Sequence, residues 1–227
     1  MVEFLLIDLD DTILDFKKAE HVAVKKTLAD FGVEPTDAVC ARYSVINQLH
    51  WEAMERKEMT RQQVLEGRFA VLFAELGVAV DAATCSHHYT ENLAIGHYFL
   101  PGAREAVEQL SKKYKLYMTS NGTAWVQRSR LKSADIEQYF GDIFISQEIG
   151  FNKPAVEYFE GCFAKIPGFD PKKAMIVGDS LSSDIKGGKN AGIATCWVNP
   201  GHEPAGEISP DYQIENLMQL EALLETL

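Results

Sequence analysis

Short apolar segments that alternate with helical patterns are the feature of this chain that most restricts its fold. One such segment opens the chain, and the others recur after about residue 100. Strands separated by helices imply right-handed crossovers, which build a parallel sheet with helices on both faces. The sequence therefore predicts an α/β fold. The expected strands are residues 4–7, 116–118, 143–145, 174–177 and 194–198.

The stretch between the first two expected strands keeps helical spacing throughout. We predict a core domain formed by residues 1–14 and 97–227, and an inserted α-helical cap domain formed by residues 15–96. The insertion leaves the sheet where ligands bind in open α/β folds, so the cap is expected above the site. The expected cap helices run from Asp15 to near Gly32, after Thr36, from the N-cap Thr60 to Gly77, and from Asp81 to about Ile95, with Val22 and Leu49 among their inward apolar residues.

The first strand ends in two carboxylates, Asp8 and Asp10, two residues apart. Strand geometry places both on the same side of the chain. Like charges at that spacing repel, so a metal ion or a lysine is needed to hold them together. An ordinary acidic turn would have the same residues. The residues at the ends of the other strands decide whether Asp8 and Asp10 form a site or such a turn.

Polar residues also follow the other expected strands. The second ends in Ser120-Asn121-Gly122, the third is followed by Lys153, and the fourth by Asp179 and Asp184. Each alone has an ordinary interpretation as a turn, a helix cap or a surface lysine. Because the carboxyl ends of parallel strands share one edge, their combination predicts a single site with several acids, a hydroxyl and a lysine.

Composition excludes some classes of function. The net charge of −11, from 33 acidic and 22 basic residues, gives no support to nucleic-acid binding. No apolar run predicts a membrane span, and the start lacks a signal-peptide pattern. The four scattered cysteines suit buried thiols in a reducing compartment, so a cytoplasmic location is expected.

Together these residues resemble the haloacid dehalogenase superfamily, in its phosphatase branch with a helical cap after the first strand. The similarity lies in Asp-x-Asp-x-Thr at residues 8–12, the hydroxyl of Ser120, Lys153, and the acids Asp179 and Asp184. It covers essentially the whole chain, and the four motifs together are specific. It implies a Rossmann-like parallel sheet core with an inserted helical-bundle cap.

The resemblance also implies a phosphomonoester hydrolase that works through an aspartyl-phosphate. In such a mechanism Asp8 is the nucleophile and Asp10 is the general acid and then the general base. Lys153, Ser120 and backbone N–H groups near Asp10 and Asn121 hold the phosphoryl oxygens. Dehalogenases on this fold lack an acid at the position of Asp10, because halide leaves without a proton.

The cofactor implied by the resemblance is Mg²⁺. Its ligands would be the Asp8 carboxylate, the main-chain carbonyl of Asp10, and Asp179. Asp184 is expected outside the ligand set, orienting a metal-bound water or Lys153.

Segments 118–122, 147–154 and 178–200 resemble pyrimidine 5′-nucleotidases most, which implies a nucleoside 5′-monophosphate as the small-molecule partner and a monomer or homodimer. The chain departs from the pattern of these enzymes at two places, and both concern substrate selectivity. Thr119-Ser120 stands where an apolar residue followed by threonine is usual. Phe151-Asn152 stands where small residues are common. A sugar-phosphate phosphatase or phosphomutase is the alternative. A non-catalytic binding protein on the same fold is a more remote one.

Several cap residues have side chains suited to substrate contact, but aromatic residues at helical spacing are usually core. Both interpretations stay open for Arg42, Tyr43, His50, Trp51, Arg56, His87, His88, Tyr89 and Asn92.

Overall fold

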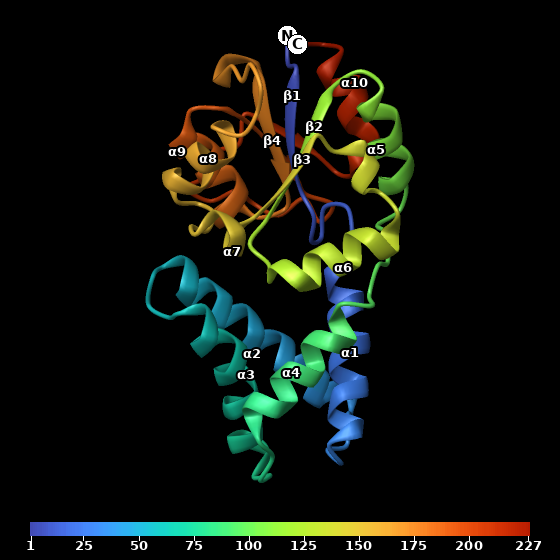
Figure 1. The fold of residues 1–227 in the computed structure, drawn as a ribbon, viewed down its shortest axis with the longest axis vertical. Helices are drawn as coiled ribbons and strands as arrows, with labels where there is room; N and C mark the ends of the chain where they lie inside the picture. The colour runs from blue at the N-terminus through green and yellow to red at the C-terminus, as the bar shows by residue number, and fades with distance from the viewer. The chain divides into compact units, whose positions relative to one another are not determined.

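The computed structural model describes residues 1–227 and contains two compact units. The sheet unit consists of Met1–Asp15 and His97–Leu227, and the helical unit of Phe16–Gly96. Figure 1 shows the strands in the first unit and only helices in the second. That the helical unit covers the carboxyl edge of the sheet stays a prediction.

The sheet has six parallel strands in the order β3-β2-β1-β4-β5-β6, which confirms the predicted α/β class. The short edge strand β6 was not predicted, because its three residues include an exposed glutamine and show no apolar run. The chain builds outward from β1 to β3 and then crosses to β4 on the other side, so the strand order reverses between β1 and β4. The strands are β1 (Phe4–Asp8), β2 (Lys115–Ser120), β3 (Asp142–Ile145), β4 (Ala174–Gly178), β5 (Ala194–Val198) and β6 (Tyr212–Ile214).

Both faces of the sheet are buried because side chains alternate along each strand. Leu5 and Ile7 of β1 pack in a cluster with α5 and α10, whereas Phe4 and Leu6 pack on the other face with α8. Figure 1 shows these helices on opposite sides of the sheet. The α-helices of this unit are α5 (Ala103–Ser111), α6 (Ala124–Ala134), α7 (Ser146–Ile149), α8 (Val156–Phe163), α9 (Lys186–Ala191) and α10 (Leu220–Leu224). Shorter helical turns are η1 (Glu137–Tyr139), η2 (Pro171–Lys173), η3 (Leu181–Ile185) and η4 (Leu217–Gln219).

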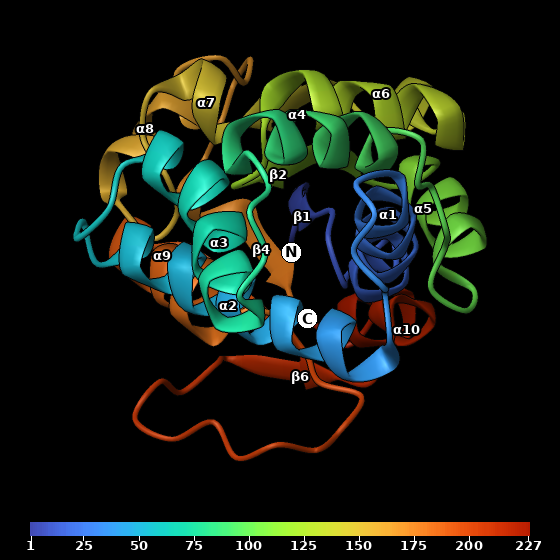
Figure 2. The ribbon, with the colours of Figure 1, turned by 90° about the horizontal axis from the view of Figure 1, so that it is seen from below.

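The helical unit contains the four expected helices, which Figure 2 shows end-on and side-on. The predicted N-cap Thr60 and helix end Gly77 are confirmed: Thr60 forms a capping box with Gln63, and Gly77 ends the third helix at φ +65°. Asp81, the expected start of the fourth helix, is its N-cap. The helices are α1 (Phe16–Asp30), α2 (Asp37–Glu55), α3 (Arg61–Leu76) and α4 (Ala82–Leu93).

For two residues of the helical unit, the prediction of an inward position is wrong. Val22 and Leu49 are 44% and 53% exposed, while the polar residues Glu20 and Asn47 are buried. The Asn47 Nδ2 amide donates to Glu20 Oε1 at 2.6 Å, so these two side chains satisfy each other inside the unit. This internal hydrogen bond explains why polar rather than apolar positions face inward.

All four cysteines are buried and none forms a disulfide, as expected for buried thiols. None of the helices combines the length and apolar character that crossing a membrane requires.

Candidate active site

Asp8 is the last residue of β1, at the reversal point of the sheet. Beyond it the chain folds into a tight loop, in which the Asp11 N–H donates to the Leu14 carbonyl at 2.7 Å and the Leu14 N–H to the Leu9 carbonyl at 2.9 Å. Asp11 lies in the left-handed region at φ +53°, which aspartate tolerates better than most residues. The loop keeps the carboxylates of Asp8 and Asp10 close to the end of the strand.

Lys153 lies between two carboxylates. Its Nζ donates to Asp8 Oδ1 and to Asp184 Oδ1, both at 2.6 Å, and all three side chains are buried. Burial lowers the pKa of Lys153, but Asp184 and Asp8 outweigh it, so that pKa is raised above its ordinary value. Burial raises the pKa of the Asp8 carboxyl well above its ordinary value, Lys153 opposes this, and the nearby acids add to it. One buried ammonium therefore faces an excess of negative charge.

Asp179 completes a group of three acids. One oxygen from each of Asp8, Asp179 and Asp184 lies within 4.8 Å of the others. The backbone fixes Asp179 on both sides: its N–H donates to Thr12 Oγ1 at 3.1 Å, and its carbonyl accepts from Trp197 Nε1 at 2.7 Å. Thr12, in the loop after β1, and Trp197, in β5, thus hold the loop after β4.

Asp184 comes from η3 and turns back to the end of β4. Its second carboxylate oxygen accepts from the Ser180 N–H at 3.2 Å. A Cβ on Gly178 would lie only 2.2 Å from this oxygen, so glycine is needed there for the close approach. Both oxygens of Asp184 therefore have protein donors, one of them Lys153.

The donor set fits a hard divalent cation. Carboxylate oxygens are the ligands that Mg²⁺ prefers, and no thiol or imidazole belongs to the group. The negative charge that Lys153 leaves unbalanced provides the electrostatic reason for a cation to bind.

Ser120 and Asp10 meet through residues that the sequence did not indicate. Gln127 Nε2 donates to Asp10 Oδ2 at 2.6 Å and to Ser120 Oγ at 2.8 Å. Arg130 Nη1 donates to Asp10 Oδ1 and, at 2.9 Å, to Gln127 Oε1. One feature of the sequence could have indicated them: Gln127 and Arg130 are polar residues on the apolar face of α6, beside Val126 and Leu131.

Asn121 lies beside Lys153, but its side chain binds the main chain there. Its Nδ2 donates to the Lys153 carbonyl at 2.9 Å, and its Oδ1 accepts from the Lys153 N–H at 2.8 Å. This paired contact joins the end of β2 to the segment that carries Lys153. A direct phosphate contact by Asn121 stays a prediction for its backbone N–H.

The helical-unit residues for which both substrate contact and an internal role were open have partners inside that unit. Tyr43 and Tyr89 are buried, and their rings pack at 5.4 Å between centroids. Trp51 Nε1 donates to Asn47 at 3.0 Å, and His50 Nδ1 lies 2.8 Å from the Ile46 carbonyl. The remaining members, Arg42, Arg56, His87, His88 and Asn92, each have a polar partner on α1, on the helix they belong to or on another segment of the unit.

Comparison with known proteins gives a consistent result. Residues 5–198 match the family of haloacid dehalogenase-like hydrolases. The chain is 41% identical to the HAD-hydrolase YfnB of Bacillus subtilis over 97% of this chain and 94% of that protein. It is 36% identical to the pyrimidine 5′-nucleotidase PynA of Streptococcus pneumoniae, covering 96% and 93%. The pyrimidine 5′-nucleotidase YjjG of Escherichia coli is 29% identical, covering 98% and 97%.

A crystal structure of YfnB bound to magnesium superimposes with a TM-score of 0.94, covering 98% of both chains at 40% identity. That structure of YfnB reveals interdomain movement. The L-2-haloacid dehalogenase of Xanthobacter autotrophicus aligns with a TM-score of 0.79 over 100% of both chains at 15% identity, and so shares the fold.

Proposed function

Because this chain belongs to the haloacid dehalogenase-like hydrolases and is a hydrolytic enzyme, we propose that it is a Mg²⁺-dependent phosphatase of nucleoside 5′-monophosphates. The observation that carries the proposal is the pair of carboxylates at the end of β1. Asp8 is paired with Lys153, and Asp10 stands two residues away on separate partners. A nucleophile and an acid–base group in separate environments suit an ester whose leaving oxygen needs a proton.

In the first step, Asp8 attacks phosphorus in line, so a bond forms between its carboxylate oxygen and phosphorus while the ester P–O bond breaks. Asp10 gives its proton to the leaving alcohol oxygen. In the second step, a water attacks the aspartyl-phosphate and Asp10 takes a proton from it. The bond between phosphorus and Asp8 breaks, and inorganic phosphate leaves.

Lys153 and Ser120 would bind the phosphoryl oxygens, together with backbone N–H groups near Asp10 and Asn121. The Ser120 hydroxyl suits this role, because its oxygen already accepts from the Gly122 N–H at 3.0 Å and from Gln127 at 2.8 Å. With two donors on its oxygen, the hydroxyl is left to donate its own hydrogen.

The Asp8 carboxylate, the Asp10 carbonyl and Asp179 would hold the Mg²⁺ ion, and Asp184 would orient Lys153. When bound, the ion offsets the repulsion between the phosphate and Asp8 and stabilises the charge that develops during transfer.

Nucleoside 5′-monophosphates are the proposed substrates because two relatives that span nearly the whole chain are pyrimidine 5′-nucleotidases. Asp10 separates the proposed activity from dehalogenation, in which the leaving halide needs no proton.

The test is phosphate release from a panel of pyrimidine and purine nucleoside monophosphates, hexose phosphates and p-nitrophenyl phosphate, with Mg²⁺ and with EDTA. We expect Mg²⁺-dependent release from the nucleotides, reduced by at least about 10³-fold in Asp8→Asn. Rapid quenching of the wild-type reaction should trap phosphate on the protein.

Asp135→Asn is the matched control, since it removes one carboxylate charge from an exposed helix end of the same unit. It should keep wild-type activity. Preferred turnover of hexose phosphates would transfer the assignment to the sugar-phosphate alternative. Turnover that survives Asp8→Asn would contradict the aspartyl-phosphate mechanism.

A further inference from the structure

The contacts of Asp10 are asymmetric. Its side chain is 28% exposed, whereas that of its ion-pair partner Arg130 is fully buried. Arg130 lies on the inward face of α6, in the same stretch as Leu131 and Ala134 of the sheet-unit core. The carboxylate is therefore anchored from the inside of the unit while one side of it stays accessible.

The orientation of the Gln127 amide follows from its neighbours. Arg130 has only donors, so the atom that accepts from its Nη1 must be Gln127 Oε1. The NH₂ group is thereby directed at the other end, toward Asp10 Oδ2 and Ser120 Oγ. One side chain thus determines the hydrogen-bond directions of both an acid–base carboxylate and a phosphate-binding hydroxyl.

The turn before α6 leaves room for this arrangement. Gly122 does not lie in the left-handed region, so its backbone conformation does not demand glycine. A Cβ at Gly122 would lie 2.5 Å from Gln127 Cγ, however, and would push the amide out of place. The glycine is explained by the position of Gln127.

We propose that Gln127 and Arg130 are positioning residues for the reaction: Arg130 holds Asp10 for proton transfer, and Gln127 couples Asp10 to Ser120. The inference rests on the proposed phosphatase function. Neither residue needs to touch substrate. Each acts through another side chain, and loss of either should impair the step in which Asp10 gives its proton to the leaving oxygen.

The test compares esters that differ in their need for a proton. A nucleoside monophosphate expels an alkoxide, which requires Asp10, whereas 2,4-dinitrophenyl phosphate expels a stable phenolate, which does not. Release of the leaving group is measured with a saturating excess of enzyme, so that only the first step is followed and weaker binding of the phosphoryl group does not lower the rate. Arg130→Met and Gln127→Leu should slow the nucleotide reaction by about 10–100-fold and the dinitrophenyl reaction by less than about threefold.

A double-mutant cycle separates positioning from general damage. If Arg130 acts through Asp10, then Asp10→Asn/Arg130→Met should be no slower on the nucleotide than Asp10→Asn alone. Arg130→Lys keeps the charge and should recover part of the lost rate. Gln127→Leu should also weaken inhibition by inorganic phosphate by about fivefold, through Ser120. Arg130→Met keeps the Gln127 amide and its contact with Ser120, and should weaken this inhibition by less than about twofold.

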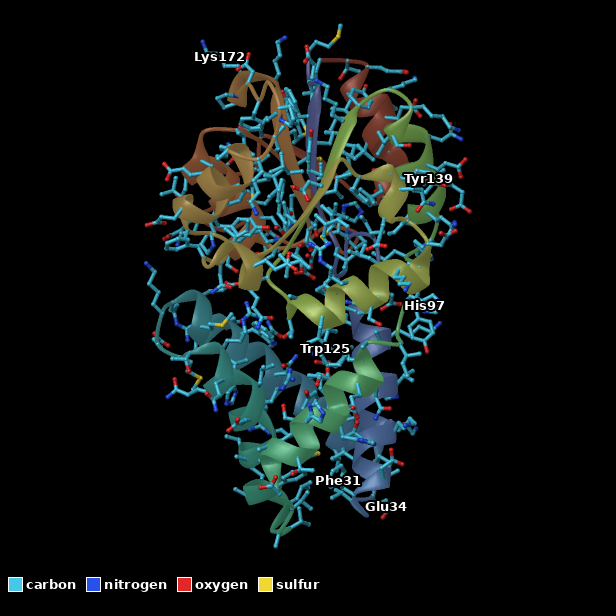
Figure 3. The ribbon with its side chains drawn as sticks, viewed as in Figure 1. Phe31, Glu34, His97, Trp125, Tyr139 and Lys172 are labelled. Carbon is cyan, nitrogen blue, oxygen red and sulfur yellow. The ribbon has the colours of Figure 1, made fainter.

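Arg128→Gln is the matched control. Arg128 is an exposed residue of α6, paired with Glu148 at 2.8 Å. It lies one turn after Trp125 of the same helix, which Figure 3 labels. Its loss should change neither ester by more than about threefold, because exposed ion pairs contribute little. Thermal melting of each variant verifies that it is folded.

Equal loss on both esters, or additive losses in the cycle, would overturn the inference while leaving the proposed function in place. Wild-type rates in both Arg130→Met and Gln127→Leu would do the same. Failure of the wild-type protein to hydrolyse any phosphate ester would instead remove the proposed function, and this inference with it.

Discussion

At the scale of single residues, Thr119 has a polar group that the fold leaves unsatisfied. Its side chain is fully buried on β2, and its hydroxyl has no hydrogen-bond partner in the protein. Such a group loses its contact with water and gains nothing in exchange. Thr119→Val has the same shape without the hydroxyl. It should raise the free energy of unfolding by about 1 kcal/mol and the melting temperature by about 2–4 °C.

Thr195 is the control for that prediction. It is equally buried on β5, but its hydroxyl donates to Asp211 Oδ2 at 2.8 Å and accepts from the Asp211 N–H at 3.0 Å. Thr195→Val should therefore lower the free energy of unfolding by about 1–2 kcal/mol. Urea denaturation of both variants measures the change in the free energy of unfolding, which should be positive for Thr119→Val and negative for Thr195→Val. Destabilisation by Thr119→Val would show that its hydroxyl has a partner, such as a buried water.

Asn121 acts at this scale through the main chain of Lys153. Removing its amide takes away both hydrogen bonds that align this segment with the end of β2. Asn121→Ala should lower kcat/KM for nucleotides by about 10–100-fold, because small displacements of a binding group are costly.

Asn190→Ala is the comparison for Asn121→Ala. Asn190 donates one exposed hydrogen bond to the neighbouring Pro154 carbonyl, at 3.1 Å. Its loss should change kcat/KM by less than about threefold. Similar losses in both variants would mean that the segment is not aligned by Asn121 in particular.

At the scale of elements, the helical unit is joined internally by polar side chains. Asn47 on α2 accepts from Arg68 Nη1 of α3 at 2.7 Å and donates to Glu20 of α1. Arg68 is 2% exposed and stacks 4.7 Å from the centre of the Tyr89 ring of α4. Two buried charges of opposite sign are thus linked through one amide, with all four helices involved.

Asn47→Ala should consequently lower the free energy of unfolding by about 2–4 kcal/mol, because buried charged groups lose a hydrogen bond that water cannot replace. Gln48→Ala, one residue along on the exposed side of α2, removes a 2.9 Å contact with Glu52 and should change stability by less than about 0.5 kcal/mol. Denaturation monitored by circular dichroism compares them. Equal small effects would indicate that Asn47 can be replaced by repacking.

At the scale of the whole molecule, the strand order determines the site. Asp8 and Asp179 follow β1 and β4, which are neighbours although Phe4–Asp8 and Ala174–Gly178 lie far apart in the sequence. The crossover that reverses the strand order places their side chains at one edge, in the crevice where ligands bind in such sheets. Lys153, from the turn after α7, and Asp184, from η3, reach the same point.

The three acids Asp8, Asp179 and Asp184 lead to a prediction about the stability of the whole protein. Mg²⁺ that binds only the folded state should stabilise it by about 2.7 kcal/mol at one hundred times its dissociation constant, or about 5–10 °C in melting temperature. Asp179→Asn should abolish most of that shift, whereas Asp135→Asn should keep it. Scanning calorimetry with and without EDTA measures this Mg²⁺-dependent shift in the melting temperature. An equal shift in both variants would place the binding of Mg²⁺ elsewhere.

Much of this arrangement follows from local patterns in the sequence. Apolar runs and their polar ends predicted five of the six strands and the edge at which Asp8, Lys153, Asp179 and Asp184 meet. Helix caps such as Thr60 were also evident, because capping depends on residues within one turn. These features were predictable because strand periodicity, capping and the direction of a parallel strand are properties of short segments.

Only the tertiary structure decided which side chains meet across elements. Gln127 and Arg130 contact Asp10 over separations of 117 and 120 residues, and nothing local marks that pairing. The inward position of Glu20 and the outward one of Val22 likewise depend on Asn47 of another helix. A buried polar group needs a hydrogen-bond partner, because it has lost its contact with water. At these positions the partner lies on another element, so only the packing of the whole chain determines whether it is present.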